Sequence, residues 1–309
     1  MTGPALELKQ LSKAFNGQTV VDRIDLVVPK NKVVALVGES GSGKTTTGLM
    51  ALRLVEPSGG RILLGGTDIT HLRQKDLKPS RRQMQVVFQD SYASLDPMMT
   101  LGEIIAEPLA IHAIGTPAER RDQARHWLER VGLDGSYATR YPHELSGGQR
   151  QRISVARALI LGASVLVADE PTSALDVSVK AQIVNLLQGL QEDMGLSMLF
   201  ISHDLSVVRS LADEVVVMLR GRVVERGPTD RIFAAAHHPY TRALLDAVPV
   251  VDPLKRRRRT FLSADEIAAS TPRFRPHEIE AQPLMDTADP QLVALAGSHF
   301  VEAIVTETR

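Results

Sequence analysis

The sequence predicts an α/β fold built around a mostly parallel β-sheet. In the second half of the chain, short apolar runs alternate with helical stretches, which is the pattern of strands joined by helices. The run Val33–Val37 is apolar at every position, as expected of a strand buried on both faces. It leads directly into the glycine-rich segment 38–45 and then into a helical pattern. The order of strand, glycine loop and helix is typical of a phosphate-binding site.

The composition fits one large globular domain with an appendage. The chain has 309 residues, of which 43% are hydrophobic, so it is long enough to bury a substantial core. The 36 basic and 36 acidic side chains cancel, and without a net field we expect no nucleic-acid partner. The sequence contains no cysteine, which excludes disulfides, thiol catalysis and thiolate-held metal or iron-sulfur sites.

Two kinds of membrane signal are missing from the sequence. The first ten residues have no charged start followed by an apolar stretch, so we expect no secretory signal. Apolar runs stay well short of the ~18 residues that a membrane-spanning helix needs. We therefore expect a chain that is soluble by itself and that acts at a membrane only through a partner.

The first elements predicted are strands at 6–11 and 20–28, separated by a turn at Asn16-Gly17. After the strand Val33–Val37 and the glycine segment, Leu49, Leu52 and Leu54 are compatible with a helix. The segment 57–60, Pro-Ser-Gly-Gly, ends that helix.

The middle of the chain changes character. Helical stretches at 101–111 and 117–131 predict a helical insertion, residues 90–158, within a discontinuous core of residues 1–89 and 159–250. The core then resumes with strands at 165–168, 197–201, 215–219 and 222–224, and with helices at 177–194 and 205–212. The sequence shows no internal repeat, which indicates a single core unit.

The last part of the chain, residues 251–309, is predicted to be a weakly patterned C-terminal extension. The basic run 255–259, Lys-Arg-Arg-Arg-Arg, follows Pro249 and Pro253 and marks the boundary. One interpretation of this run is a solvated linker. The other is contact with anionic lipid headgroups, at ~1 kcal/mol per charge near the surface.

The glycine segment carries the first chemical prediction. Gly38, Gly41 and Gly43 allow backbone conformations in which successive N–H groups converge on phosphate oxygens, at the positive end of the following helix. Lys44 adds a fixed charge, and Thr45 offers a hydroxyl to Mg²⁺. We assign the neighbouring Ser40 and Thr46 to the same nucleotide site. The alternative is a glycine-rich turn that happens to precede a helix.

Two acidic residues follow the apolar strand 165–168. Asp169 lies at the carboxyl end of that strand, the usual ligand crevice of open α/β sheets, where we expect it to hold Mg²⁺ through water. Glu170, one residue on, points elsewhere and is a candidate general base for the attacking water. A helix cap or a solvated turn explains such a pair equally well in isolation, but the upstream phosphate loop favours the catalytic interpretation.

The segment Ser146-Gly147-Gly148-Gln149 predicts a capping box, with Ser at the N-cap and Gln at N3, opening a helix at 149–162. Two glycines at a helix N-terminus also offer an anion site. A helix of this length runs ~21 Å towards the Asp169 strand, so its start is expected far from the phosphate loop of its own chain. The anion site is then expected to serve a nucleotide held by another subunit. Alternatively, the glycines only shape the start of the helix.

Five elements in this order resemble the ATP-binding cassette (ABC) ATPases of transporters over about residues 5–250: the glycine loop, Gln89, the Leu-Ser-Gly-Gly-Gln of 145–149, the pair Asp169-Glu170, and His203. The resemblance implies a P-loop NTPase core of the ABC type with a helical signature subdomain and an antiparallel β subdomain. It also implies two cassettes dimerised head to tail. Each ATP then lies between the glycine loop of one cassette and the signature of the other.

The same resemblance implies roles for four further residues. Gln89 becomes a ligand of Mg²⁺ and water that senses the γ-phosphate, and His203 a γ-phosphate contact beside Glu170. Asp176 lies in the loop that communicates between the two sites. Phe15 lies close to the position of an aromatic residue that stacks on adenine, a contact of ~1–3 kcal/mol. From the residues alone, His203 also fits a polar loop position, and Phe15 a core position.

A narrower resemblance concerns the segment 238–245, His-Pro-Tyr-Thr-Arg-Ala-Leu-Leu, with Pro249 after it. It is similar to the C-terminal hallmark of ATPases that serve oligopeptide, dipeptide and nickel importers. The segment 89–97 resembles the same subfamily, in which Pro is commoner at the position of Ser91. Many of these subunits hold an iron-sulfur cluster on tail cysteines, which this chain lacks.

The resemblance implies an ATP-hydrolysing importer subunit that uses ATP and Mg²⁺ to drive uptake of oligopeptides or dipeptides. Its implied partners are a second ABC ATPase, which the segment 92–97 favours as a different chain, two transmembrane permeases and, indirectly, an extracytoplasmic solute-binding protein. The expected location is peripheral, at the cytoplasmic face of the inner (plasma) membrane.

Three alternatives stay open at this point. An importer ATPase for another solute, such as nickel, fits the same motifs. An exporter ATPase leaves the segment 238–245 unexplained. A non-transport cassette acting on DNA or ribosomes fits less well, because the insertion shows no sustained heptads and the chain has one cassette.

Overall fold

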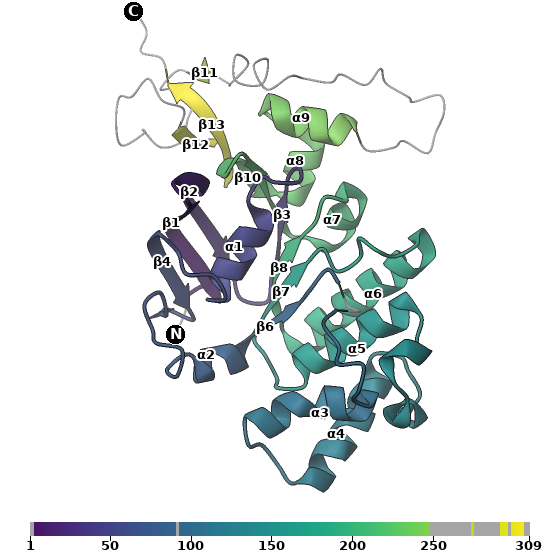
Figure 1. The fold of residues 1–309 in the computed structure, drawn as a ribbon. Coiled ribbons are helices and arrows are strands. Elements are labelled where there is room, and N and C mark those ends of the chain that lie inside the picture. Colours follow the sequence, from purple (N-terminus) through teal and green to yellow (C-terminus); the bar gives the residue numbers. More distant parts are fainter. Residues whose placement is uncertain (1–2, 91–92, 248–272, 275–290, 296–297, 306–309) are drawn as a thin grey trace, which may run out of the picture.

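The computed structural model describes residues 3–90, 93–247, 273–274, 291–295 and 298–305 (Figure 1). Ser91 and Tyr92, Pro249, Pro253 and the basic run 255–259 lie outside the described residues, as does most of the C-terminal extension. Among the described helices, none is both long and apolar enough to cross a membrane.

The central sheet confirms the predicted α/β fold. Its strand order is β11-β13-β10-β9-β3-β8-β7-β6, with β12 paired to β13. The five strands β9, β3, β8, β7 and β6 run parallel, whereas β10 pairs antiparallel with β9 and β13 pairs antiparallel with β10. The bounds are β3 Val33–Val37, β6 Met84–Val87, β7 Val165–Asp169, β8 Ser197–Ile201, β9 Glu214–Leu219, β10 Arg222–Pro228, β11 Arg273–Phe274, β12 Gln291–Leu295 and β13 His299–Val305.

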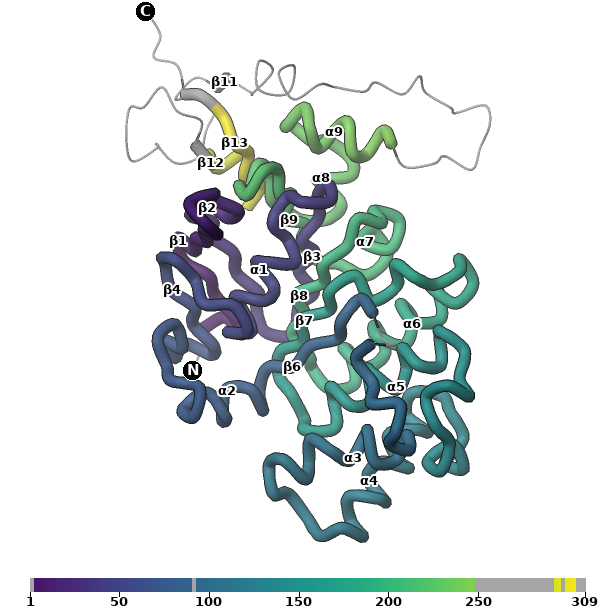
Figure 2. The backbone as a smooth tube through the Cα atoms, viewed as in Figure 1, coloured from purple at the N-terminus to yellow at the C-terminus, as the bar shows by residue number. Residues whose placement is uncertain are grey.

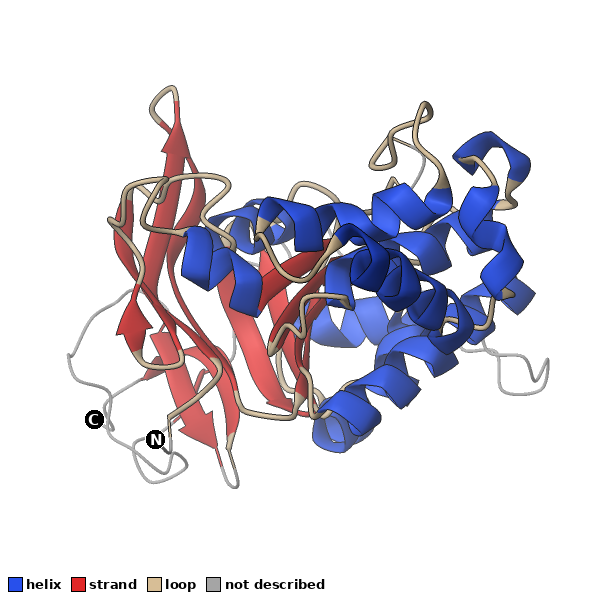
Figure 3. Ribbon diagram, turned by 90° about the horizontal axis from the view of Figure 1, so that it is seen from below, coloured by secondary structure: helices blue, strands red, loops and turns tan. Residues whose placement is uncertain are grey.

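A second, antiparallel sheet of order β2-β1-β4-β5 packs against this central sheet (Figure 3). Its strands are β1 Leu6–Phe15, β2 Gln18–Val28, β4 Gly59–Leu64 and β5 Thr67–Asp68. The predicted turn at Asn16-Gly17 joins β1 to β2. Strand β3 contributes side chains to the core on both faces of the central sheet. Val34 and Leu36 join the core beneath the antiparallel sheet. The alternate residues, Val33 among them, join the core on the helical side, as the period of two in a strand requires.

Most helices gather on the other side of the central sheet (Figure 3). The helix Lys44–Ala51 is an exception, because its Met50 and Ala51 join the core beneath the antiparallel sheet. The part of the chain predicted as a helical insertion forms a lobe of α3, α4 and α5 (Figure 1). The helices are α1 Lys44–Ala51, α2 Lys78–Gln83, α3 Leu101–Ile111, α4 Pro117–Arg130, α5 Gly147–Leu159, α6 Val177–Met194, α7 Leu205–Leu211, α8 Thr229–Ala235 and α9 Pro239–Asp246, with 3-10 turns η1 Gly135–Thr139 and η2 Pro142–Glu144.

Several elements differ from the sequence prediction. Strands β1 and β10, for example, extend to Phe15 and Pro228, past the predicted ends at 11 and 224. Helix α1 ends at Ala51, and Leu54 beyond it is 51% exposed, so only the first part of the predicted leucine pattern is helical. Helix α5 begins at Gly147, two residues before the predicted start, because Ser146 already caps it. The chain after residue 251 was expected to be weakly patterned, yet β13 pairs with β10 and extends the central sheet.

Candidate active site

The parallel strands bring the predicted site residues to one edge of the central sheet. Strand β3 ends at the glycine loop, and β7 ends at Asp169. Their common neighbour β8 aligns Ile201 with both Leu36 and Asp169, so the residues that follow all three strands emerge together. His203 comes two residues after β8, and Gln89 comes two residues after β6, which is paired to β7.

The glycine loop needs its glycines for space as well as for backbone angles. Gly38, Gly41 and Gly43 have φ angles of 151°, 80° and 101°, in the region that side chains rarely adopt. A Cβ on Gly38 would lie 2.2 Å from the Met218 carbonyl oxygen, and one on Gly43 would lie 2.8 Å from the Val20 carbonyl oxygen. Gly41 instead faces open space and is exposed, which leaves room for a ligand at the tip of the loop.

Lys44 lies inside the loop that it follows. Its Nζ donates hydrogen bonds to the carbonyl oxygens of Gly38, at 2.8 Å, and Glu39, at 2.7 Å, and the residue is 5% exposed. Burial lowers the pKa of the Lys44 ammonium, and the carboxylates of Glu170 and Asp169 oppose that effect. The positive charge is thus held at the centre of the loop. Ser40 and Thr45 are exposed beside it, and Thr46 is half-buried.

Thr45 and Asp169 form the pair expected to hold Mg²⁺. The Thr45 hydroxyl lies 3.3 Å from Asp169 Oδ1, and Asp169 is 7% exposed. Burial raises the pKa of the Asp169 carboxyl, which the Thr45 hydrogen bond partly offsets. A hydroxyl and a carboxylate are the oxygen donors that Mg²⁺ prefers, so these residues fit the ion. Gln89 is exposed at the same edge of the sheet and would add an amide oxygen.

Glu170 turns away from Asp169 because of its backbone. Its φ angle is 46°, in the left-handed region, while its N–H still donates to the Ile201 carbonyl oxygen at 2.9 Å. The neighbouring strand therefore holds the backbone while the side chain leaves in a new direction. Glu170 Oε1 reaches His203 Nδ1 at 3.1 Å, with the histidine side chain 56% exposed. The two residues predicted as base and γ-phosphate contact are thus adjacent, and the histidine faces solvent.

Phe15 lies at the end of β1, at the tip of the hairpin with β2. It is 45% exposed, so the alternative of a core position is wrong. The same hairpin supports the glycine loop, because the Val20 carbonyl oxygen faces Gly43. Lys13 Nζ lies over the Phe15 ring, 4.8 Å from its centroid. An exposed aromatic face close to the phosphate loop suits a planar base.

The signature segment opens α5 as the sequence predicts. The Ser146 hydroxyl accepts from the Gln149 N–H, and the Gln149 side chain accepts from the Ser146 N–H, which confirms the capping box. The two glycines differ in their surroundings. A Cβ on Gly147 would lie at an ordinary 3.5 Å from Leu175, whereas one on Gly148 would lie 2.3 Å from Val179 Cγ1. Gly148 therefore allows α5 and α6 to pack closely, and Gly147 leaves one backbone position of the helix start open.

Asp176 caps α6 next to this helix start. Its carboxylate accepts from the Val179 N–H at 3.0 Å and from the Ser178 hydroxyl at 2.7 Å. The backbone hydrogen bond, followed by the hydroxyl one, lowers the pKa of Asp176. Because Leu175 faces Gly147, the loop that ends at Asp176 and the signature segment share one surface.

Two contacts to the glycine loop were missed at the sequence level. The Gly221 N–H, in the turn between β9 and β10, donates to the Ser42 carbonyl oxygen at 3.0 Å. The Glu39 N–H donates to the Tyr240 hydroxyl at 2.8 Å. The first has no sequence signal beyond a turn glycine. The second lies in the segment 238–245, which the sequence marked only as a subfamily hallmark.

Comparisons with known proteins agree with this geometry. Residues 21–173 match the family described as ABC transporter, and residues 224–286 match the family described as oligopeptide/dipeptide transporter, C-terminal region. A putative peptide import ATP-binding protein of Brucella ovis is 46% identical over 309 residues, covering 97% of this chain and 98% of that protein. The glutathione import ATP-binding protein GsiA of Salmonella paratyphi A is 48% identical over 280 residues, covering 87% of this chain and 45% of that protein.

Solved structures give the same result at the level of the fold. CbiO1 from Clostridium perfringens, part of the ABC transporter complex cbiONQ, superposes with a TM-score of 0.69 at 28% identity, covering 75% of this chain and 92% of that one. An ATP-binding cassette solved as a dimer in a post-hydrolysis state, bound to ADP and Pi, gives a TM-score of 0.67 at 29% identity, covering 72% and 98%. With such matches along its length, and with the loop, the paired carboxylates and the signature helix in place, the chain belongs to the ATP-binding subunits of the ABC transporter family.

Proposed function

We propose that this chain hydrolyses MgATP as one of two cassettes of an importer, and that it thereby drives uptake of oligopeptides or dipeptides through partner permeases at the cytoplasmic face of the membrane. The observation that carries the catalytic part is the placement of Glu170 beside His203, at the sheet edge where the glycine loop lies. The cargo class is supported by the match of residues 224–286 and by the peptide import relatives.

The roles of the site residues follow from their chemistry. Lys44 and the N–H groups at the start of α1 neutralise and orient the phosphates. Thr45, Asp169 and Gln89 would hold Mg²⁺, which supplies further charge neutralisation on the phosphate oxygens when bound. The Glu170 carboxylate takes a proton from the attacking water, and His203 orients the carboxylate and contacts the γ-phosphate. Phe15 stacks on the base.

The proposed second cassette accounts for the surface around the signature. Ser146 is exposed, and Val177, directly after the cap residue Asp176, is 84% exposed although it is apolar. An apolar side chain beside an open helix N-terminus suits a protein partner that also brings an anion. In the proposed head-to-tail dimer, this surface covers the ATP of the other cassette. We propose that the other cassette is a different chain.

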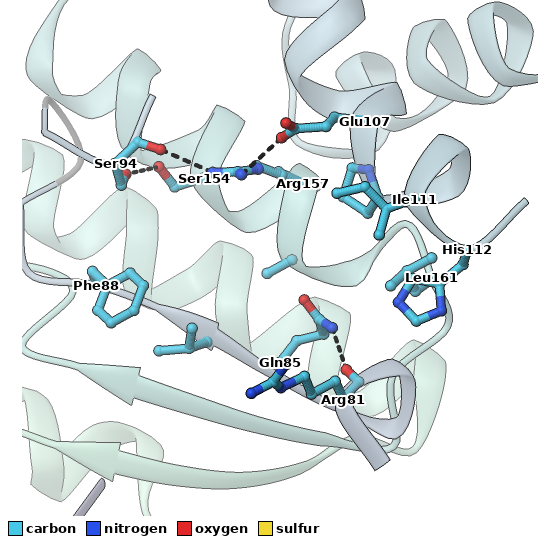
Figure 4. A pocket seen from close by; sticks show the side chains of 13 residues that line it. Arg81, Gln85, Phe88, Ser94, Glu107, Ile111, His112, Ser154, Arg157 and Leu161 are labelled. Carbon is cyan, nitrogen blue, oxygen red and sulfur yellow. Dashed lines mark hydrogen bonds and ion pairs between the residues drawn. The ribbon is translucent and has the colours of Figure 1, made fainter. Parts of the chain in front are cut away.

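The permeases have a candidate docking groove, a cavity of about 280 Å³ between β6, α3 and α5 (Figure 4). Phe88 and Ile111 line it and are 38% and 60% exposed. Arg157 connects two of the segments that line the cavity. Its guanidinium donates to the Ser94 carbonyl oxygen at 2.8 Å and to the Glu107 carboxylate at 2.8 Å. Because Phe88 directly precedes Gln89, a permease segment seated here would contact the residue next to the γ-phosphate sensor. We propose that residues 90–158 rotate together with this groove relative to the core of residues 1–89 and 159–250. We also propose that residues 251–309 form a C-terminal extension.

Transport of labelled peptides tests the proposed cargo. We expect a strain lacking this chain to lose most uptake of a radiolabelled dipeptide or tetrapeptide, and the intact gene to restore it. The variant Ile111→Glu should bind ATP normally but fail to restore uptake, because it places a charge in an apolar contact with the permease. Surface variant Glu192→Gln, on the solvent side of α6, is the matched control and should restore uptake fully. Normal peptide uptake without this chain, with loss of nickel uptake instead, would refute the peptide assignment.

A further inference from the structure

Tyr240 links the C-terminal part of the core to the nucleotide loop. It lies in α9 with 1% of its surface exposed, and its ring joins the core on the helical side of the sheet. Its hydroxyl accepts the Glu39 N–H at 2.8 Å. Burial raises the pKa of Tyr240 to about 12, so the hydroxyl stays neutral and can accept this bond at any physiological pH. Figure 2 shows the purple loop after β3 reaching the green α8 and α9 segment.

The peptide unit that Tyr240 holds is the one that anchors the loop lysine. The Gly38 carbonyl and the Glu39 N–H belong to the same peptide. Its oxygen accepts from Lys44 Nζ at 2.8 Å, and its N–H donates to Tyr240. A peptide next to a glycine rotates easily unless both of its polar groups are fixed. The Tyr240 hydroxyl therefore helps to fix the orientation of the Gly38 carbonyl oxygen, and this oxygen accepts a hydrogen bond from the Lys44 ammonium.

Tyr240 is itself held in place by a buried network. His238 caps α9, and its Nδ1 accepts the Tyr240 N–H at 3.2 Å. Burial lowers the pKa of His238 to about 4, which keeps the ring neutral and its nitrogen free to accept. Glu225 in β10, fully buried, accepts the N–H groups of His237 and His238 at 2.7 and 3.1 Å. The segment that leads into α9 is thus fixed to the central sheet.

The C-terminal strand completes this network. His299 in β13 is buried, and its Nε2 lies 2.7 Å from Glu225 Oε1. Burial alone would raise the pKa of Glu225, but the hydrogen bonds from His299 and from the backbone of His237 and His238 bring it below its ordinary value. The carboxylate is therefore ionised and accepts from both sides. A continuous path of hydrogen bonds runs from β13 through Glu225, His238 and Tyr240 to the glycine loop.

We propose that Tyr240 is a positioning residue for the glycine loop, and that the pair of Glu225 with His299 in the C-terminal strand holds it there. The proposal rests on ATP binding by the glycine loop and is independent of which solute is imported. Among the described residues, Tyr240 forms no hydrogen bond with Glu170 or His203, so we expect its effect on nucleotide affinity and not on the chemical step.

The test removes one hydroxyl from the full-length chain. We expect Tyr240→Phe to raise the equilibrium Kd for MgATP by about 3- to 10-fold, since a single hydrogen bond to the loop is lost while the ring still fills its place. In the assembled complex, KM for ATP should rise by the same factor and kcat should stay within about twofold. In the absence of nucleotide, the Glu39 amide of the variant should exchange hydrogen faster than that of the parent. This readout does not depend on activity.

Tyr141→Phe is the matched control. Tyr141 is 39% exposed and stacks on His143. The Kd of this variant for MgATP and the exchange of its Glu39 amide should therefore match those of the parent. An unchanged Kd and unchanged exchange in Tyr240→Phe would overturn the proposal. A fall in kcat with an unchanged Kd would overturn it too, because the residue would then act on chemistry.

A double-variant cycle tests the C-terminal half of the path. His299→Leu should also raise the Kd, and adding it to Tyr240→Phe should bring little further loss, because both changes break the same path. His299→Gln, which keeps a donor towards Glu225, should recover most of the affinity. Fully additive losses, or a normal Kd in a folded His299→Leu variant, would refute the role of β13.

Discussion

Replacing Lys44 with alanine is expected to abolish tight binding of MgATP. The ammonium is the fixed positive charge of the loop, and its hydrogen bonds to the Gly38 and Glu39 carbonyl oxygens also keep the loop closed. The variant therefore loses phosphate neutralisation and loop order together. Charged hydrogen bonds of this kind predict that the Kd rises by ~100-fold or more. Equilibrium binding of a fluorescent ATP analogue to the purified chain measures it directly.

Lys32→Ala is the control for the loss of a lysine. Lys32 pairs with Asp213 on the surface at 2.7 Å, with about half of its side chain exposed, so nucleotide affinity should not change. Unchanged binding of MgATP in a folded Lys44→Ala variant would show that the glycine loop does not hold the phosphates.

Glu170→Gln is expected to separate binding from hydrolysis. Glutamine keeps the size of the side chain and can still bond to His203, but it cannot accept a proton from water. ATP should bind with near-parent affinity while kcat falls by ~10²-fold or more. Single-turnover hydrolysis in the reconstituted complex, measured beside equilibrium binding, gives both quantities.

The control for this change is Glu192→Gln, since Glu192 lies on α6 and bonds only to Gln188 at 3.3 Å among the contacts described. It should hydrolyse ATP at the parent rate. Near-normal turnover in Glu170→Gln would move the base elsewhere. His203 would then be the next residue to replace, because its Nδ1 lies 3.1 Å from Glu170 Oε1.

The sequence predicted the strands and helices best where a pattern was strict. Strands β3 and β8 and helices α3 and α6 have the predicted bounds, because the strands are apolar at all or nearly all positions and the helices are periodic between clear stop signals. The predicted end of α1 was wrong because Leu54 continues the leucine spacing without being buried. Strand β13 was missed because its pairing with β10 joins residues far apart in the chain.

The site residues, too, could be predicted only where the sequence carries a local pattern. Residues whose role depends on the local chain, such as the capping pair Ser146 and Gln149, were predictable because one helix turn brings them together. The bond between Tyr240 and Glu39 was not, because it joins positions 201 residues apart. The sequence marked Tyr240 as part of a subfamily segment without indicating what it touches.

The proposed head-to-tail dimer makes a crossed prediction for the signature. In Gly147→Asp, a carboxylate would meet the γ-phosphate of the partner's ATP and repel it in a partly desolvated interface. The fold should tolerate the change, since a Cβ there lies 3.5 Å from Leu175 and an acidic residue suits a helix N-terminus. Gly147→Ala adds the Cβ without the charge and is the matched control. Gly148 is unsuitable because a Cβ there would collide with Val179.

The most direct measurement is site-specific nucleotide trapping in the reconstituted complex. Vanadate traps a labelled azido-nucleotide at each active site, and separating the chains then shows which site has turned over. We predict that Gly147→Asp leaves ATP binding to the Lys44 loop intact but stops turnover at the partner's site, as loss of the partner's own loop lysine would. Loss of turnover at the site that holds Lys44, with the partner's site spared, would contradict the head-to-tail arrangement.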